Sequence, residues 1–306
     1  MRLLACGVLA ALVCSFIGTA AQVPPVNALL TQARAAIGDE ATLSGLSAFR
    51  IRGSSTRRLG GRSLPSSIEI NCVLPAQFVE IERRSLSRGP LGDVLITDYH
   101  GFNGDEPFRQ TVAPGLPIPP VIAGPEPATP EEVARAKARQ LDSHRRDFVA
   151  LYLLMLAASP EAYPVTFSPA GRVELPSGPA DVLDVDAQTG FRWRLFLDAA
   201  THLPVRLTWQ GRPTAMVSVS STVAVSPSGD VRPIGAPPPP LPADPTAGMP
   251  DVEWALEVTE HRETDGVVWP RRLRKTAGGE LQEELQFRNY DLNPRIDEKV
   301  FAVKRF

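Results

Sequence analysis

The feature that most constrains this chain is an uncharged run, FVALYLLMLAA, at residues 148–158. A helix that is apolar on every face must be enclosed. Eleven residues rise only about 16 Å as a helix, whereas the hydrocarbon core of a bilayer is about 30 Å thick. Ser159 and Pro160 then end the run. We therefore expect these three turns to be buried inside a protein fold.

The start of the same helix is marked by Thr129, Pro130, Glu131 and Glu132. Threonine at the N-cap, proline at the first helical position and glutamate at the third form a capping box at the positive end of the helix dipole. The first half of the segment carries many charges and can face water. One long helix is predicted over residues 129–158, with a charged half followed by an apolar half.

The N-terminus has the pattern of a secretory signal peptide. Met1 and Arg2 precede an apolar run over 3–17, and small residues follow up to Ala21. An uncleaved anchor is the alternative, but the run is shorter than the roughly 20 residues a span needs. A second alternative is a lipoprotein, in which a cysteine just after the apolar run carries the lipid. Cys6 comes too early for this, and Cys14 follows Ala-Leu-Val, where a small residue is expected. We predict a signal peptide over 1–21 and a periplasmic protein.

Charge and cysteine content further limit the kinds of protein that this chain can be. The net charge of −2 argues against a nucleic-acid partner held mainly through its phosphates, and 43% hydrophobic residues suffice for a sizeable core. Without the signal peptide, Cys72 is the only thiol, so the fold depends on packing and not on an internal disulfide. Cys72 alternates with Ile68, Ile70 and Leu74, which predicts a buried strand residue.

Alternating apolar and polar residues predict many antiparallel strands. A helix over Val26–Ile37, ended by Gly38, and a helical turn over 40–46 come before them. If each strand has one wet and one dry face, a single large curved antiparallel sheet results, and the long helix fills its concave side. The predicted fold is therefore α+β. The Pro-rich segment 226–250 should not pair as a strand, and we interpret it as a loop inserted between strands of one domain over 22–306.

Three segments resemble the LolA-like family of periplasmic carriers. They are AIGDEATL at 36–43, FRWRLFLDAATHLPVRLTW at 191–209, and an ending in which an asparagine is followed by Ile296-Asp297 and Val300-Phe301. The resemblance covers residues 26–306. It implies an unclosed antiparallel barrel around helices, whose apolar concave face holds acyl chains of lipids or lipoproteins. Relatives with the same fold include envelope sensors of the RseB type. A protein-interaction or sensor domain with a packed core is therefore the alternative function.

An apolar ligand site needs adaptable, bulky side chains on the helix and on the sheet that faces it. Helix positions spaced i, i+3, i+4 and i+7 share one face, and tryptophan and leucine recur on the strands. Each of these side chains has an alternative role as a packed core residue. The predicted lining residues are Phe148, Leu151, Tyr152, Met155, Trp193, Leu195, Trp209 and Trp254.

Signals of catalysis are weak. The sequence has no HExxH, CxxC, GxSxG, Walker or GxGxxG motif, and its four histidines are scattered. Asp98 and His100 flank Tyr99, which we interpret as polar residues at a strand end and not as an acid–base pair. The aspartates at 181, 184 and 186 indicate a strand and not a calcium loop. We expect a non-enzymatic protein without metal or cofactor, whose partners are lipids, acyl chains or envelope proteins.

Overall fold

The computed structural model describes residues 24–87, 92–114, 129–213, 223–225, 231–233 and 248–302. The predicted signal peptide lies outside these residues, as does most of the Pro-rich segment.

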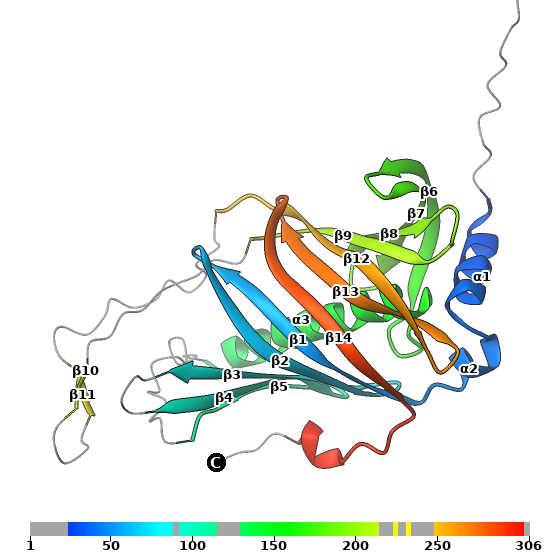
Figure 1. The fold of residues 1–306 in the computed structure, drawn as a ribbon. Coiled ribbons are helices and arrows are strands. Elements are labelled where there is room, and N and C mark those ends of the chain that lie inside the picture. The colour runs from blue at the N-terminus through cyan, green and yellow to red at the C-terminus, as the bar shows by residue number, and fades with distance from the viewer. Residues whose placement is uncertain are drawn as a thin grey trace, which may run out of the picture.

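The described chain forms one antiparallel sheet of 12 strands (Figure 1). Its order is β5-β4-β3-β2-β1-β14-β13-β12-β9-β8-β7-β6, and the edge strands β5 and β6 do not pair with each other. The sheet is therefore open. The strands are β1 (Ala48–Leu59), β2 (Arg62–Val73), β3 (Gln77–Ser87), β4 (Asp93–Asn103), β5 (Glu106–Val112), β6 (Val165–Leu175), β7 (Gly178–Ala187), β8 (Arg192–Asp198), β9 (Pro204–Gly211), β12 (Val252–Thr264), β13 (Val267–Ala277) and β14 (Glu280–Leu292).

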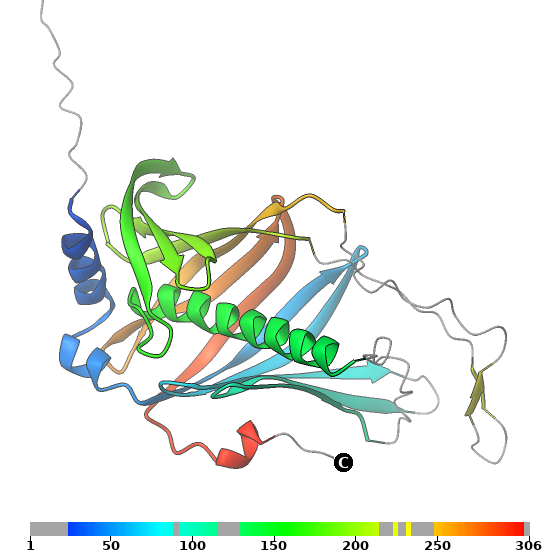
Figure 2. The ribbon, with the colours of Figure 1, turned by 180° about the vertical axis from the view of Figure 1, so that it is seen from behind.

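The long helix α3 (Pro130–Leu156) crosses the concave side of this sheet (Figure 2). Thr129 Oγ1 accepts a hydrogen bond from the Glu132 amide at 3.2 Å, and the Glu132 carboxylate accepts one from the Thr129 amide at 3.0 Å. The predicted capping box is thus present. The helix ends at Leu156, where Ala157 adopts a left-handed conformation and donates to the Leu153 carbonyl oxygen at 3.0 Å.

Helices α1 (Val26–Ile37) and α2 (Glu40–Ser44) precede the sheet, and a 3-10 turn, η3 (Glu298–Phe301), follows it. The predicted fold, an unclosed antiparallel sheet that wraps a long helix and carries an N-terminal helix, is confirmed. This is also the architecture that the resemblance to the LolA-like family implied.

Gly38 ends α1 in an extended conformation, where an added Cβ would lie 3.1 Å from the Gly266 carbonyl oxygen.

The apolar half of α3 is the centre of the main core. Phe148, Leu153 and Met155 are each no more than 1% exposed. The Phe148 ring lies 5.7 Å from that of Phe78 and 5.9 Å from that of Phe102, between centroids. Burial of side chains of this size contributes about 1.5–3 kcal/mol each. The expectation that the sheet encloses residues 148–158 is therefore correct.

The expectation that each strand has only one dry face was wrong for β3. Val79 and Ile81 are buried on the face opposite Phe78, where they form a second cluster with Phe108 and Phe301. Phe301 belongs to η3, so this turn covers part of the convex side. The alternation in β3 separates two buried faces and not a buried face from a wet one.

One further expectation needs correction. Val231–Pro233 (β11) pairs with Val223–Val225 (β10) in a separate two-stranded sheet, although the Pro-rich segment was expected not to pair. Its other residues between 226 and 247 lie outside the described chain. The segment connects β9 to β12, which are hydrogen-bonded neighbours.

A bulge bends β1 against β14 at Arg52 and Gly53. A Cβ atom added at Gly53 would lie 2.1 Å from the Gln286 carbonyl oxygen, so the two backbones approach more closely than any side chain allows. Bulges increase local twist and bend a strand. Gly53 therefore contributes to the curvature that gives the sheet its concave side.

Candidate ligand-binding site on the concave face

The concave face changes character along its strands. On β1, Phe49 and Ile51 are fully buried in the main core, while Ser55 and Arg57, in phase with them, belong to a polar network. The strand register places like residues side by side. Ile70 of β2 and Tyr290 of β14 lie opposite Ile51, and Glu283 of β14 lies opposite Arg57. One half of the face is therefore apolar, and the other half is charged.

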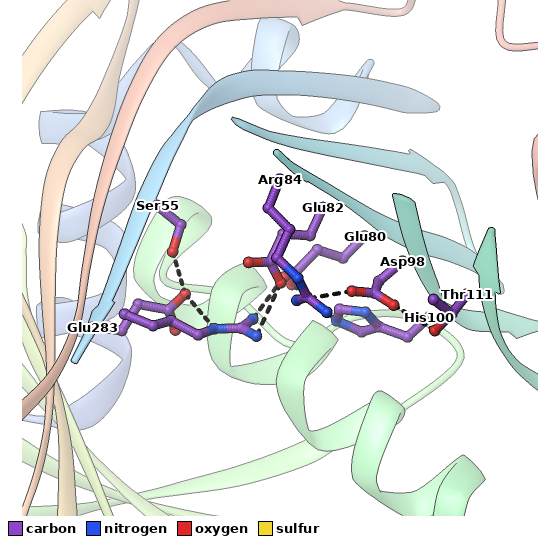
Figure 3. A network of polar contacts seen from close by, with 9 residues as sticks. Ser55, Glu80, Glu82, Arg84, Asp98, His100, Thr111 and Glu283 are labelled. Carbon is purple, nitrogen blue, oxygen red and sulfur yellow. Dashed lines mark hydrogen bonds and ion pairs between the residues drawn. The ribbon is translucent and has the colours of Figure 1, made fainter. Parts of the chain in front are cut away.

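The charged half is centred on Arg57, and Figure 3 labels its partners Glu80, Glu82 and Glu283. Its guanidinium lies 2.9 Å from the Glu82 carboxylate, 3.1 Å from Glu283 and 3.9 Å from Glu80. Ser55 Oγ donates a further hydrogen bond to Glu283 at 2.5 Å. The carboxylate of Glu82 is only 5% exposed. Charges so little exposed to water need partners, and Arg57 is shared among three carboxylates.

His100 extends the network onto β4 (Figure 3). Its Nε2 lies 3.4 Å from the Glu80 carboxylate. Burial by itself raises the pKa of Glu80, but the His100 cation and its hydrogen bond outweigh burial, so this pKa falls to about 2. Burial likewise lowers the pKa of His100, and the Glu80 charge reverses the effect and raises it. The two groups therefore favour an ion pair.

The expectation that Asp98 and His100 lie at a strand end was wrong, because β4 continues to Asn103. The two side chains do not pair with each other. Asp98 forms an ion pair with Arg84 at 3.0 Å and accepts a hydrogen bond from Thr111. His100 pairs with Glu80. Both are parts of the polar network of the sheet.

Helix α3 places its own titratable groups against this network. The His144 ring stacks on that of His100 at 5.8 Å between centroids. Burial, together with the positive charges of His100 and Arg109, lowers the pKa of His144 to about 4. Burial raises the pKa of Asp147. Near neutral pH, His144 is therefore an uncharged ring between the helix and the charged half of the sheet.

An inner cavity of about 220 Å³ lies between α3 and the sheet. Apolar side chains form most of its wall, and charged groups of the network form one end. The apolar residues are Ile68, Ile70, Phe78, Ala150, Leu151, Trp209, Leu256, Leu273, Leu285 and Phe287. The charged residues are Arg57, Glu80, His100, Asp147, Lys275 and Glu283.

A larger space of about 560 Å³, here called the vestibule, adjoins the inner cavity. The two spaces share Asp147, Ala150, Trp209 and Lys275 as lining residues. Four aromatic residues line the vestibule together with five charged ones. The rings of Trp209 and Trp254 stack at 6.1 Å between centroids with an angle of 6° between their planes. An apolar chamber with an aromatic entrance is suited to an elongated amphiphile.

The eight predicted lining residues fall into two groups. Trp193 and Trp254 line the vestibule, Leu151 lines the inner cavity, and Trp209 lines both. Phe148, Met155 and Leu195 lie in the main core, and Tyr152 packs against it while remaining partly exposed. Contact between the first four and a ligand remains a prediction.

The charged residues that face the cavities, such as Arg57, Glu80 and Lys275, were not among the predicted site residues. Strand periodicity offers a partial signal, because Glu80 is in phase with Phe78 and Arg57 is in phase with Ile51. Cys72 is buried as predicted, and burial raises the pKa of its thiol. The aspartates at 181, 184 and 186 lie in β7, as expected.

In the described part of the chain, no group of three or more His, Cys, Asp or Glu side chains is placed to hold a metal ion. Over the same residues, no helix has both the length and the apolar character needed to cross a membrane.

The sequence matches no family model and no curated protein. Among solved structures, the chain is similar to a DUF1329 family protein from Desulfovibrio piger (10% identity, 91% of this chain and 98% of that one, TM-score 0.44). It is also similar to a LolA superfamily protein from Nitrosomonas europaea (9% identity, 91% and 98%, TM-score 0.42). A third is a domain named for outer membrane lipoprotein sorting, from Vibrio parahaemolyticus (10% identity, 89% and 95%, TM-score 0.43). Identity and TM-score are low, so the function proposed below rests on this chain's own residues.

Proposed function

We propose that this protein is a periplasmic carrier or binding protein for lipid or lipoprotein acyl chains. The observation that carries the proposal is the inner cavity between α3 and the sheet, whose wall is mostly apolar and which adjoins the aromatic vestibule. Packed cores leave few voids larger than a water molecule. An apolar space of about 220 Å³ at the centre of the concave face is therefore a candidate for binding and not a packing defect.

The sizes of the two spaces suit a non-covalent ligand held along α3. The inner cavity alone, at about 220 Å³, is smaller than the roughly 300–1,000 Å³ of common ligand sites. The adjoining vestibule of about 560 Å³ brings the combined site into that range. We infer that the end of one acyl chain lies against Leu256, Leu273 and Leu285, while the rest extends past the tryptophans. The predicted signal peptide supports the periplasmic location.

The test is direct binding of a fluorescent long-chain fatty acid to the purified mature protein. Leu285→Trp places an indole in the inner cavity, and Leu95→Trp adds the same group at a leucine that is 54% exposed. We expect saturable uptake by the wild type and by Leu95→Trp, with at least tenfold weaker binding to Leu285→Trp. Circular dichroism confirms folding, since overpacking costs about 1–3 kcal/mol. Leu256→Trp repeats the test from β12, which is separated from β14 by β13.

Absence of uptake by folded wild-type protein would overturn the proposal, and so would equal affinity of the two tryptophan variants. A second function, an envelope interaction or sensor domain, is favoured by the extent to which α3 is solid core, as at Phe148 and Leu153. Such a domain takes up no acyl probe. Its binding to a protein partner should instead depend on the Pro-rich segment and survive Leu285→Trp.

A further inference from the structure

We propose that the vestibule selects amphiphiles with an anionic head group, a phosphate or a carboxylate, and that Lys275 and Arg146 receive it. This inference rests on the proposed function and specifies the ligand class of the same site. It also fixes an orientation, in which the head group stays in the vestibule and the apolar chain enters the inner cavity.

Lys275 lies on β13 and lines both the vestibule and the inner cavity. Its ammonium lies 5.4 Å from the centroid of the Trp254 ring. No carboxylate of the described residues lies within ion-pair distance of it. Glu283 is opposite Lys275 in the strand register, but that carboxylate binds Arg57 and Ser55. The Lys275 charge acts on Glu80 and Asp147 at longer range, but no ion pair occupies its ammonium, which can therefore contact a ligand.

Arg146 projects from α3 into the same vestibule. Its guanidinium lies 4.8 Å from the centroid of the Phe191 ring, and it too forms no ion pair within the described chain. The preceding residue differs, because Arg145 pairs with Asp105. Two cations held over aromatic rings thus line one space, one from the helix and one from the sheet. Aromatic contact orients a cation without neutralising it.

The other charges around the vestibule support an anionic ligand. Arg212 adds a third basic group, and Ser143 adds a hydroxyl donor. The acidic groups are Asp147 and Asp251. Three basic side chains thus stand against two acidic ones. The lining therefore carries more positive than negative charge, as phosphate and carboxylate recognition requires.

The charged end of the inner cavity is already neutralised by its own pairs. There Glu80, Glu82 and Glu283 contact the guanidinium of Arg57, and Glu80 also pairs with His100. An anion that entered this end would find both of these cations engaged by carboxylates. The vestibule offers better contacts, because Lys275 and Arg146 have no ion pair among the described residues. The chain therefore enters first, and its anionic group remains at Lys275 and Arg146.

The experiment uses the full mature protein and four twelve-carbon probes below their micelle concentrations: dodecanoate, dodecyl phosphate, dodecanol and dodecyltrimethylammonium. Calorimetry should show at least tenfold tighter binding of the two anions than of dodecanol. Added salt should reduce that preference. The ratio of the two anions distinguishes a phosphate head group from a carboxylate.

Lys275→Gln should remove most of the anionic preference, measured as the ratio of anion affinity to dodecanol affinity on the same variant, and the double variant with Arg146→Gln should bring that ratio to about one. Lys275→Arg keeps the charge and should keep the preference. Lys137→Gln and Arg135→Gln are matched controls on α3, outside both spaces, and should behave as the wild type.

Equal binding of all four probes by the wild type would overturn this inference and leave the proposed function intact. Tighter binding of the trimethylammonium probe would also overturn it, since the carboxylates of the inner end would then be the recognising groups. Wild-type preference retained in folded Lys275→Gln and in the double variant would do the same. Failure of every probe to bind would instead overturn the proposed function.

Discussion

The two halves of α3 meet the same sheet in different ways. The C-terminal half inserts Phe148, Leu153 and Met155 among buried rings and aliphatic side chains. The N-terminal half is attached through exposed ion pairs, Lys137 with Glu106 and Arg145 with Asp105. The cavities lie between the packed half and the charged half of the helix, around Asp147 and Ala150. One helix can thus hold the fold together at one end and leave space for a ligand beside the other.

The largest effect should come from the packed half. Phe148→Ala removes a ring that touches Phe78 and Phe102, and a cavity of this kind costs about 3–5 kcal/mol of unfolding free energy. Urea denaturation measures the loss. Leu86→Ala is the control, because Leu86 is 48% exposed and should change stability by no more than about 0.5 kcal/mol. Equal losses would mean that this half of α3 is not the core.

The next effect is a pH dependence at the junction of the halves. The pKa of His144 is lowered to about 4 by burial and by the charges of His100 and Arg109. Unfolded His144 binds a proton near pH 6.5, so the unfolded state takes up more protons and stability falls as pH drops from 6.5 toward 4. His144→Gln should reduce the loss between pH 7 and pH 4.5 by about 2 kcal/mol.

The stability contribution of His100 has the opposite pH dependence to that of His144, whereas that of Glu80 has the same direction at lower pH, so both serve as internal references. The raised pKa of His100 adds stability below pH 6.5 that is lost as pH rises through its folded pKa. The pKa of Glu80, about 2, adds stability above pH 4.5 that is lost as pH falls from 4.5 toward 2. Identical pH profiles for the wild type and His144→Gln would show that His144 is not held neutral.

A smaller effect is expected from the charged half of the sheet. Arg57→Met leaves Glu80, Glu82 and Glu283 without their shared cation. Unpaired buried carboxylates are costly, but Arg57 is 40% exposed, so we expect a loss of about 2 kcal/mol after solvent screening. Arg58→Met, at the exposed neighbour on β1, is the control. A double-mutant cycle of Arg57→Met with Glu82→Gln isolates the pair, and a coupling energy near zero would contradict the network.

The smallest effect should come from the exposed end of α3. Lys137→Ala removes an ion pair whose side chains are 47% and 68% exposed, and such pairs contribute about 0.2–1 kcal/mol. We expect a change of about 0.5 kcal/mol or less, and less still in high salt. A loss as large as that of Phe148→Ala would abolish the distinction between the two halves.

Local signals allowed the helices and most strands to be predicted. The capping box at Thr129 is encoded by neighbouring residues, and so is the apolar run after Asp147. Strand β6 gave no such signal, because Pro169 and Gly171 interrupt its alternation. Proline is tolerated there because β6 is an edge strand, and position in a sheet is a property of the complete fold.

The candidate site was only half predictable for a similar reason. Tryptophan and leucine at Trp209 and Leu151 signal an apolar wall in the sequence itself. A sequence does not show that Arg57 and Glu283 meet, because they lie 226 residues apart and are joined only by the register of β1 with β14. In the sequence alone, Lys275 cannot be distinguished from an exposed lysine. Only the fold places the Trp254 ring beside it.

The pairing of β1 with β14 also governs the order in which this molecule can be completed. Asn293 accepts a hydrogen bond from the amide of Ser47, 246 residues earlier, at 2.7 Å. During synthesis or export with the N-terminus leading, β1 can pair with β2 early. Its other edge, which faces β14, remains unpaired until nearly the whole chain has emerged. Contacts so distant in sequence slow folding and leave strand edges open to aggregation. The central seam of the sheet is thus the last part that can form, and a chaperone that shields β1 would act during that interval.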